Sequence, residues 1–218
     1  FIGVDIFFVI SGYLITKIII NKKYNDLNYI NFVKNRIRRI FPGLIFMILL
    51  SIPLFFLILS PNHLIKFANS IISNIFFLPN FYFWTQSNYF DLSSSFKPLL
   101  HTWSLGIEFH FYFLWPFLFI FLYKLTKKKI ILNLSLISLI ILSIIFLEIL
   151  IKKGPVFENK FLYGIFVSDT IFFLSPFRIF EFIFGSLLAI NLKRIQNNFY
   201  NEILFIFELL IIFFSSIY

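Results

Sequence analysis

The residues best suited to chemistry lie between positions 99 and 116. Because residues three and four apart share one face of a helix, His101, Ser104, Glu108, Tyr112 and Trp115 form one polar and aromatic stripe. Ionisable groups within a membrane helix are costly and usually face a bundle interior or a watery cavity. A histidine and a glutamate two turns apart on such a face could position and deprotonate a hydroxyl group. An aromatic belt at the membrane interface, with Glu108 bonded to a neighbouring helix, is an equally good interpretation of the spacing.

Two more titratable residues stand near glycines. His110 projects to the opposite face of the same helix, beside Trp103 and Gly106, where packing is the favoured interpretation. Asp5 shares a helical face with Gly12 and could orient a catalytic base or bind sugar hydroxyls near the outer end of its helix. An interfacial carboxylate beside a glycine that permits close helix packing is the alternative.

A basic cluster precedes Pro42 and contains Arg36, Arg38 and Arg39. Guanidinium groups bind phosphate oxygens bidentately, so three arginines in four positions suit a phosphate-bearing ligand. From the residues alone, an anchor that fixes membrane topology is the favoured interpretation.

Arg178 and Glu181 form an i,i+3 pair that can neutralise itself near the outer face of the membrane. Gly185 and Ala189 follow as a stripe of small residues suited to close helix packing. A structural ion pair is the favoured role.

The composition places these motifs in a membrane protein. Sixty per cent of the 218 residues are hydrophobic and 13% are charged, whereas soluble domains average about 45–50% apolar and about 25% charged residues. The net charge of +9 comes from Lys and Arg clusters between apolar runs, as in cytoplasmic loops. Nucleic-acid binding would need a continuous basic face, so we expect no nucleic-acid partner. The chain has no cysteine and no metal-ligand cluster, so we expect no metal.

A helix needs about 20 apolar residues to cross the bilayer. Runs that approach or exceed this length cover residues 1–20, 40–60, 99–123, 130–151, 177–192 and 202–218. We therefore expect an all-α, polytopic transmembrane helix bundle of about six helices. It should form one domain over residues 1–218, truncated at both ends because the chain begins and ends within apolar stretches.

Charge predicts the direction of each span. The basic residues 22–39 and 127–129 belong on the cytoplasmic side, so the first span runs inward, the second outward and the span at 99–123 inward. No full crossing then fits between them, and the interrupted apolar segment 67–84 should lie in the interface or re-enter from outside. A reporter fused near Asn88 should be extracytoplasmic.

Taken in order, these segments resemble the membrane-bound acyltransferase-3 family, whose members O-acylate cell-surface glycans. The matching blocks are Gly-Val-Asp-Ile-Phe-Phe-Val-Ile-Ser-Gly at 3–12, Arg-Ile-Arg-Arg-Ile-Phe-Pro at 36–42, Leu-Leu-His-Thr-Trp-Ser-Leu at 99–105, Glu108 with Phe111-Tyr112, and the block of Arg178, Glu181 and Gly185. Each motif is weak alone, but their order and separations are specific, and the resemblance covers about residues 1–190.

The resemblance implies a multi-helix enzyme of the inner membrane of a bacterial envelope. Such enzymes take an acyl group, commonly acetyl, from cytoplasmic acyl-CoA and deliver it to a hydroxyl of a lipopolysaccharide, exopolysaccharide, peptidoglycan or similar acceptor outside. The expected partners are therefore membrane lipid, the acyl-CoA donor and a glycan acceptor, with no permanently bound cofactor and no set oligomeric state. The implied catalytic residues are Glu108, His101 and Asp5, the implied acyl-CoA-binding residues are Arg36, Arg38 and Arg39, and the implied substrate-binding residues are Ser104, Trp103, Tyr112, Arg178 and Glu181.

Two departures from the family matter. Its catalytic histidine lies on a helix that precedes residue 1, so we expect the main base outside this chain and the fragment alone to be inactive. The family often has an acidic residue and then glutamine where this chain has Phe109 and His110, which leaves acceptor contacts there open.

A transporter or flippase of glycans or glycolipids is the alternative from another functional class. The interrupted segment 67–84 favours it, because broken helices at the membrane midplane are typical of transporters. A non-catalytic assembly subunit is a third possibility, but it would not need a polar stripe around Glu108.

Overall fold

The computed structural model of the chain describes residues 2–21, 28–87, 97–126, 128–153 and 167–192. Every element in these ranges is helical and none of the described residues forms a strand, which confirms the predicted all-α class.

Four helices are long and apolar enough to cross a membrane. They are α1 (Ile2–Asn21), α2 (Tyr29–Ile58), α5 (Trp103–Thr126) and α6 (Lys129–Lys153). The shorter elements are α3 (Pro61–Ile75), α4 (Pro79–Thr85), α7 (Val167–Phe173), α8 (Ile179–Asn191) and 3₁₀ turns at Leu100–Thr102 and Ser175–Phe177.

Helix α2 begins earlier than its apolar run predicts. The prediction started at residue 40, but the helix starts at Tyr29, where the side chain of Asn28 accepts a hydrogen bond from the Asn31 amide at 3.1 Å. Lys and Arg are good helix formers, so the basic cluster continues the helix although it is too polar to count as part of a span.

Helix α8 is shorter than the predicted span at 177–192. Its 13 residues extend about 20 Å at 1.5 Å per residue, less than the hydrocarbon core of about 30 Å. Pro176 is the second residue of the 3₁₀ turn that precedes the helix, and proline favours such a starting position because it has no N–H to donate. The last predicted span, 202–218, and the reporter position Asn88 lie outside the described residues.

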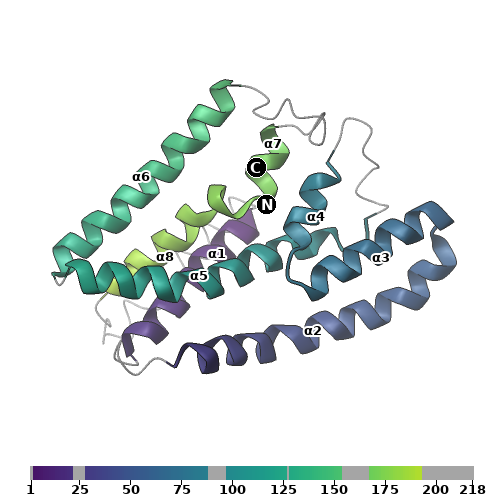
Figure 1. Cartoon of the computed structure of the whole chain (residues 1–218), viewed down its shortest axis with the longest axis horizontal. Coiled ribbons are helices and arrows are strands. Elements are labelled where there is room, and N and C mark those ends of the chain that lie inside the picture. The colour runs from purple at the N-terminus through teal and green to yellow at the C-terminus, as the bar shows by residue number, and fades with distance from the viewer. Residues whose placement is uncertain (1, 22–27, 88–96, 127, 154–166, 193–218) are drawn as a thin grey trace, which may run out of the picture.

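The helices alternate in direction as the charge clusters predict. In Figure 1, α1, α5 and α8 run one way and α2 and α6 run the other, so the start of α2 and the end of α5 meet at one end of the bundle. The basic residues Lys34–Arg39 and Lys124 therefore share that end.

The segment predicted to be interrupted forms two short helices. Helix α3 doubles back beside α2, and α4 turns away again next to the start of α5 (Figure 1). The break falls at Phe77, whose backbone has φ 57°, a left-handed conformation that is uncommon for a bulky residue. Neither helix is among the four that are long enough to cross a membrane, and the choice between an interfacial and a re-entrant segment stays a prediction.

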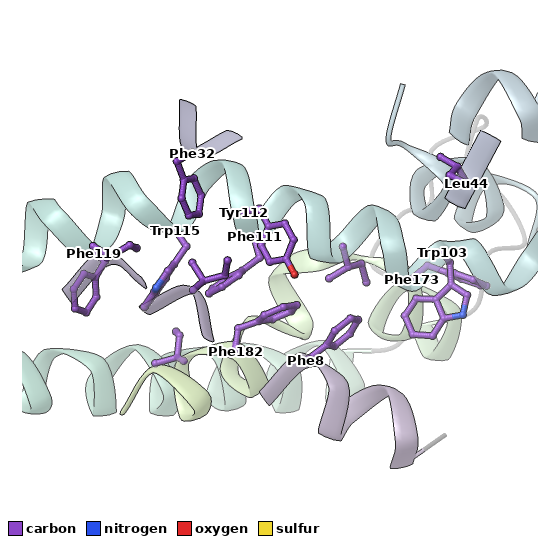
Figure 2. Packing of buried hydrophobic residues seen from close by; sticks show 14 of the residues in the cluster. Phe8, Phe32, Leu44, Trp103, Phe111, Tyr112, Trp115, Phe119, Phe173 and Phe182 are labelled. Atoms are coloured by element: carbon purple, nitrogen blue, oxygen red, sulfur yellow. The ribbon is translucent and has the colours of Figure 1, made fainter. Parts of the chain in front are cut away.

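The core lies where α1, α5 and α8 meet (Figure 2). Phe182 of α8 stacks on Phe8 of α1 and on Phe111 of α5, with ring centroids 4.6 and 4.2 Å apart. Trp115 and Phe119 continue the buried row along α5.

Two glycines let α1 and α8 pack backbone to backbone. A Cβ atom on Gly12 would overlap the carbonyl of Phe182, and one on Gly185 would overlap the carbonyl of Val9. Close approach through small residues is the usual way in which membrane helices associate. The predicted packing role of both glycines is therefore visible, and it fixes the register of α1 against α8.

Candidate active site

A cavity of 340 Å³ lies among α1, α2 and α5. Its lining includes Arg39, Gly43 and Met47 from α2 and Glu108 and Tyr112 from α5. Its volume falls within the range of about 300–1,000 Å³ that is usual for small-molecule sites. The cavity thus brings one predicted acyl-CoA-binding arginine to the predicted catalytic glutamate.

The Glu108 carboxylate is held in a fixed orientation. The side chain is 4% exposed, the Ser11 hydroxyl donates to Oε1 at 2.9 Å, and the Tyr112 hydroxyl donates to the same oxygen. Among the described residues, both side-chain hydrogen bonds of Glu108 end on Oε1. Oε2 is therefore the oxygen that remains for a ligand.

The origins of these two donors differ. Tyr112 lies one helical turn from Glu108, so the i,i+4 spacing predicts that they share a face. Ser11 comes from α1, 97 positions away, and no sequence spacing points to it. Its one signal is its place beside Gly12, because the glycine that permits close packing also brings the serine to α5.

The three arginines of the basic cluster have different surroundings. Arg39 lines the cavity. Arg36 lies beside it, with its guanidinium carbon 5.8 Å from the Tyr112 ring centre and 5.4 Å from that of Phe32, within the range of cation–π contacts. Arg38 is exposed and is not part of the lining. Their predicted role in phosphate binding stays a prediction.

His101 lies near the end of the cavity that is remote from Arg39. Its Nε2 is 3.0 Å from the sulfur of Met47, a lining residue. The lining from the 3₁₀ turn and α5 runs from Thr102 to Tyr112, about 15 Å along the helix axis. The arginine end and the histidine end thus belong to one elongated space.

Two other predicted residues are not brought to this cavity. The Ser104 hydroxyl donates to the backbone carbonyl of His101 at 3.3 Å. Trp103 is buried against Phe8 and Phe172, at ring centroid distances of 6.4 and 4.4 Å. A direct substrate contact for either residue stays a prediction, and the geometry favours positioning and packing roles.

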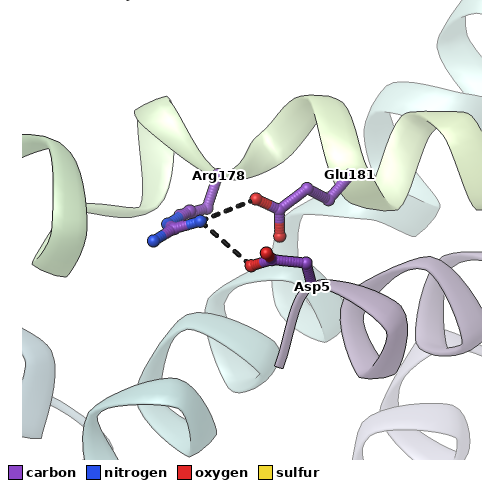
Figure 3. A network of polar contacts seen from close by, with 3 residues as sticks. All are labelled: Asp5, Arg178 and Glu181. Atoms are coloured by element: carbon purple, nitrogen blue, oxygen red, sulfur yellow. Dashed lines mark hydrogen bonds and ion pairs between the residues drawn. The ribbon is translucent and has the colours of Figure 1, made fainter. Parts of the chain in front are cut away.

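Asp5, Arg178 and Glu181 form a separate ion cluster (Figure 3). Arg178 Nη1 lies 3.1 Å from Asp5 Oδ1 and 2.9 Å from Glu181 Oε1. The i,i+3 pair expected from spacing is present, and Asp5 joins it instead of lining the cavity. The cluster connects the beginnings of α1 and α8.

His110 faces the other side of α5. Its Nδ1 is 2.9 Å from the hydroxyl of Ser175, which precedes α8. Packing was the favoured interpretation of this histidine, and the polar partner from the 3₁₀ turn could not be predicted because it lies 65 positions away.

Comparison with known proteins adds a family and several relatives. A family model described as an acyltransferase domain matches residues 1–218. A Haemophilus influenzae protein named only as uncharacterized is 37% identical over 187 residues, which is 85% of this chain and 73% of that protein. No solved structure matches.

Two relatives have functional names. The O-acetyltransferase OatA of Staphylococcus aureus is 38% identical over 148 residues, covering 66% of this chain and 24% of OatA. The putative peptidoglycan O-acetyltransferase YrhL of Bacillus subtilis is 33% identical over 203 residues, covering 91% of this chain and 30% of YrhL. The chain therefore spans about a quarter to a third of the length of these two relatives.

Proposed function

Because this chain belongs to the acyltransferase-3 family, we propose that it forms part of an integral membrane enzyme that acylates a cell-surface glycan. The donor is cytoplasmic acyl-CoA, with acetyl as the first candidate, and the acceptor is a sugar hydroxyl outside the inner membrane. The names of OatA and YrhL support an O-acetyl product, and the name of YrhL supports a peptidoglycan-type acceptor. The observation that carries the proposal is the single cavity lined by both Arg39 and Glu108.

The donor binds at the arginine end. Arg39 lines the cavity, and Arg36 and Arg38 lie within the same turn of α2. Guanidinium groups suit the phosphates of coenzyme A, and the positive-inside rule puts this end in the cytoplasm, where acyl-CoA is available. The thioester arm then extends along the cavity toward Glu108.

The acceptor hydroxyl meets the thioester beside Glu108. Oε2 accepts a hydrogen bond from that hydroxyl while Ser11 and Tyr112 hold Oε1 in place. The acceptor oxygen attacks the thioester carbonyl while its proton passes to the general base, the carbon–sulfur bond breaks, and the departing coenzyme A thiolate takes up that proton. His101 lies at the acceptor end, and the family resemblance assigns the main base to a helix before residue 1.

The outer ion cluster has a positioning role in this scheme. Arg178 bonds both Asp5 and Glu181, so these residues hold the beginnings of α1 and α8 together near the acceptor entrance. Asp5 acts on the reaction through this geometry, because α1 also carries Ser11.

The test uses the full-length protein in its membrane. Glu108→Gln and Arg39→Ala should each lower acyl-CoA-dependent glycan acylation by about 100-fold or more, the scale of a lost catalytic or orienting group. Product is measured as labelled acyl ester on isolated envelope glycan, and membrane insertion is checked in parallel.

Matched controls keep this test specific. Glu148→Gln changes a carboxylate of α6 whose side chain is 61% exposed, and acylation should not change. Full activity in both Glu108→Gln and Arg39→Ala would remove these residues from the mechanism. A wild-type protein that moves glycan across the membrane without acylating it would favour the transporter alternative.

A further inference from the structure

A second hollow lies on the opposite side of α5, between α5 and α8. It is a groove of 740 Å³ lined by Leu114, Leu118 and Phe121 among others from α5 and by Ser175 and Ile179 from the α8 side. Apart from His110 and Ser175, the lining side chains are aliphatic or aromatic. The groove is thus apolar, with one polar pair in it.

The polar pair has the geometry of a nucleophile and its base. His110 Nδ1 lies 2.9 Å from Ser175 Oγ, within hydrogen-bond distance. In the neutral tautomer whose Nδ1 carries no hydrogen, this nitrogen accepts the hydrogen bond and the Ser175 hydroxyl donates it.

The base is also held in position by its surroundings. The Phe81 ring lies 5.5 Å from the imidazole, and Ser175 is the first residue of the 3₁₀ turn that precedes α8. A hydroxyl within hydrogen-bond distance of a histidine is a pairing of nucleophile and base that covalent catalysis uses.

The exposed side of the groove is apolar. Leu114, Phe117 and Phe121 are 59%, 56% and 62% exposed on a helix long enough to cross the membrane. Apolar side chains exposed on such a helix suit lipid better than water, so the ligand that this groove suits is apolar. An alkyl chain fits the lining, because the groove offers few polar partners to any other group.

We propose that Ser175 and His110 form a second catalytic site, which accepts the acyl group of a membrane-dissolved long-chain ester. Ser175 Oγ attacks the ester carbonyl and its proton passes to His110 Nδ1. The bond from the carbonyl carbon to the alcohol oxygen breaks, and His110 returns the proton to the departing alcohol. An acyl-serine forms, and water or another hydroxyl releases the acyl group by the same steps in reverse.

The first experiment asks whether Ser175 is nucleophilic. Full-length wild-type protein in native membranes is treated with a long-chain alkyl fluorophosphonate, and the modified residue is mapped by mass spectrometry. The expected result is one phosphonylated residue, Ser175, with no need for acyl-CoA. No adduct at Ser175 while an added serine hydrolase is labelled, or equal labelling of exposed serines such as Ser138, overturns the proposal.

The second experiment asks whether His110 is the base. His110→Asn should slow labelling by about 100-fold or more, as expected for loss of a general base, and Ser175→Ala should abolish it. Ser138→Ala, which removes a hydroxyl bonded only to its own helix, should label like the wild type. Wild-type labelling of His110→Asn overturns the proposal.

The third experiment asks whether the groove holds the alkyl chain. Leu118→Trp fills the groove and should slow labelling by the long-chain probe by at least about tenfold, the scale of a steric change in a hydrophobic pocket, without slowing a methyl fluorophosphonate. Leu125→Trp is the matched control, because Leu125 is 64% exposed on the same helix and does not line the groove. Equal effects of both variants, or of both probes, overturn the groove assignment. The labelling results do not depend on whether the protein acylates a glycan.

Discussion

The interface between α1 and α8 and the space between α2 and α5 use glycine in opposite ways. Gly12 and Gly185 lack a Cβ where one would overlap the partner helix. Gly43 lines the cavity, and a Cβ built there meets nothing within 4 Å. Gly12 and Gly185 let the backbones of α1 and α8 touch, whereas Gly43 leaves open space in the cavity.

Packing between α1 and α8 also affects the cavity between α2 and α5. Ser11 is the neighbour of Gly12 in sequence and donates to Glu108 in the cavity. Because backbone contact with α8 fixes the height and rotation of α1, it also fixes where the Ser11 hydroxyl lies. The orientation of the Glu108 carboxylate therefore depends on how the opposite face of α1 packs against α8.

The largest expected effect comes from disrupting the interface between α1 and α8. Gly12→Ala should destabilise the protein by about 3 kcal/mol or more, because the added methyl group meets backbone that cannot move aside. The measurement is the folded fraction in detergent during a denaturant titration.

The control for this variant lies on the same helix. Gly3 has nothing within 4 Å of a built Cβ, and alanine suits a helix better than glycine by roughly 0.5–1 kcal/mol. Gly3→Ala should therefore leave stability unchanged or slightly higher. Equal losses in the two variants would contradict the role of Gly12.

Filling the cavity beside Gly43 should remove activity and leave the fold intact. Gly43→Leu places a side chain in the cavity between Arg39 and Glu108, so acylation should fall by about 100-fold or more through displaced substrate. Leu50→Phe, at an exposed α2 position, should keep its activity. A Gly43→Leu protein that is fully active would show that the substrate binds elsewhere.

Removing one hydroxyl from the cavity should have an intermediate effect. Tyr112→Phe deletes one of two donors to the Glu108 carboxylate, and a hydrogen bond to a charged group contributes about 1.5–3 kcal/mol. Glycan acylation should therefore fall by about 10- to 100-fold. Tyr29→Phe, which removes a hydroxyl bonded to the Phe113 carbonyl, is the comparison and should not reduce the rate.

The smallest effect is expected from removing the hydroxyl of Thr16, which lies on α1 and bonds to α8 and α5. Thr16 accepts from the Trp115 indole and donates to Ser186, both at 2.8 Å. Thr16→Val should cost about 1 kcal/mol of stability, as for other hydrogen bonds between membrane helices. Acylation by the folded fraction should be unchanged, and a loss comparable to that of Tyr112→Phe would mean that the two regions are not distinct.

The spans could be predicted where apolar runs and charged flanks coincide. Residues 1–20, 99–123 and 130–151 correspond to α1, α5 and α6 within a few positions. The apolar run 40–60 did not locate the start of α2 at Tyr29, because hydropathy identifies the residues that suit the membrane, whereas the helix also includes the basic segment before them. The shortness of α8 was missed for a related reason, since an apolar run does not show where the helix begins.

The site could be predicted only where its residues share a helix. Glu108 and Tyr112 follow from a four-residue spacing, and so does the pairing of Arg178 with Glu181 at three. Ser11, Ser175 and the link from Asp5 to Arg178 depend on contacts between helices far apart in sequence. Spacing holds no information about such contacts until the packing of the helices is known.

The arrangement of the ion cluster also separates the balancing of a charge from the docking of a helix. Arg178 is the N-cap residue of α8 and pairs with Glu181 in the first turn of that helix, so its counter-ion is supplied three positions along the chain. Asp5 is therefore not needed to balance Arg178, and its contact at 3.1 Å attaches the beginning of α1 to the beginning of α8.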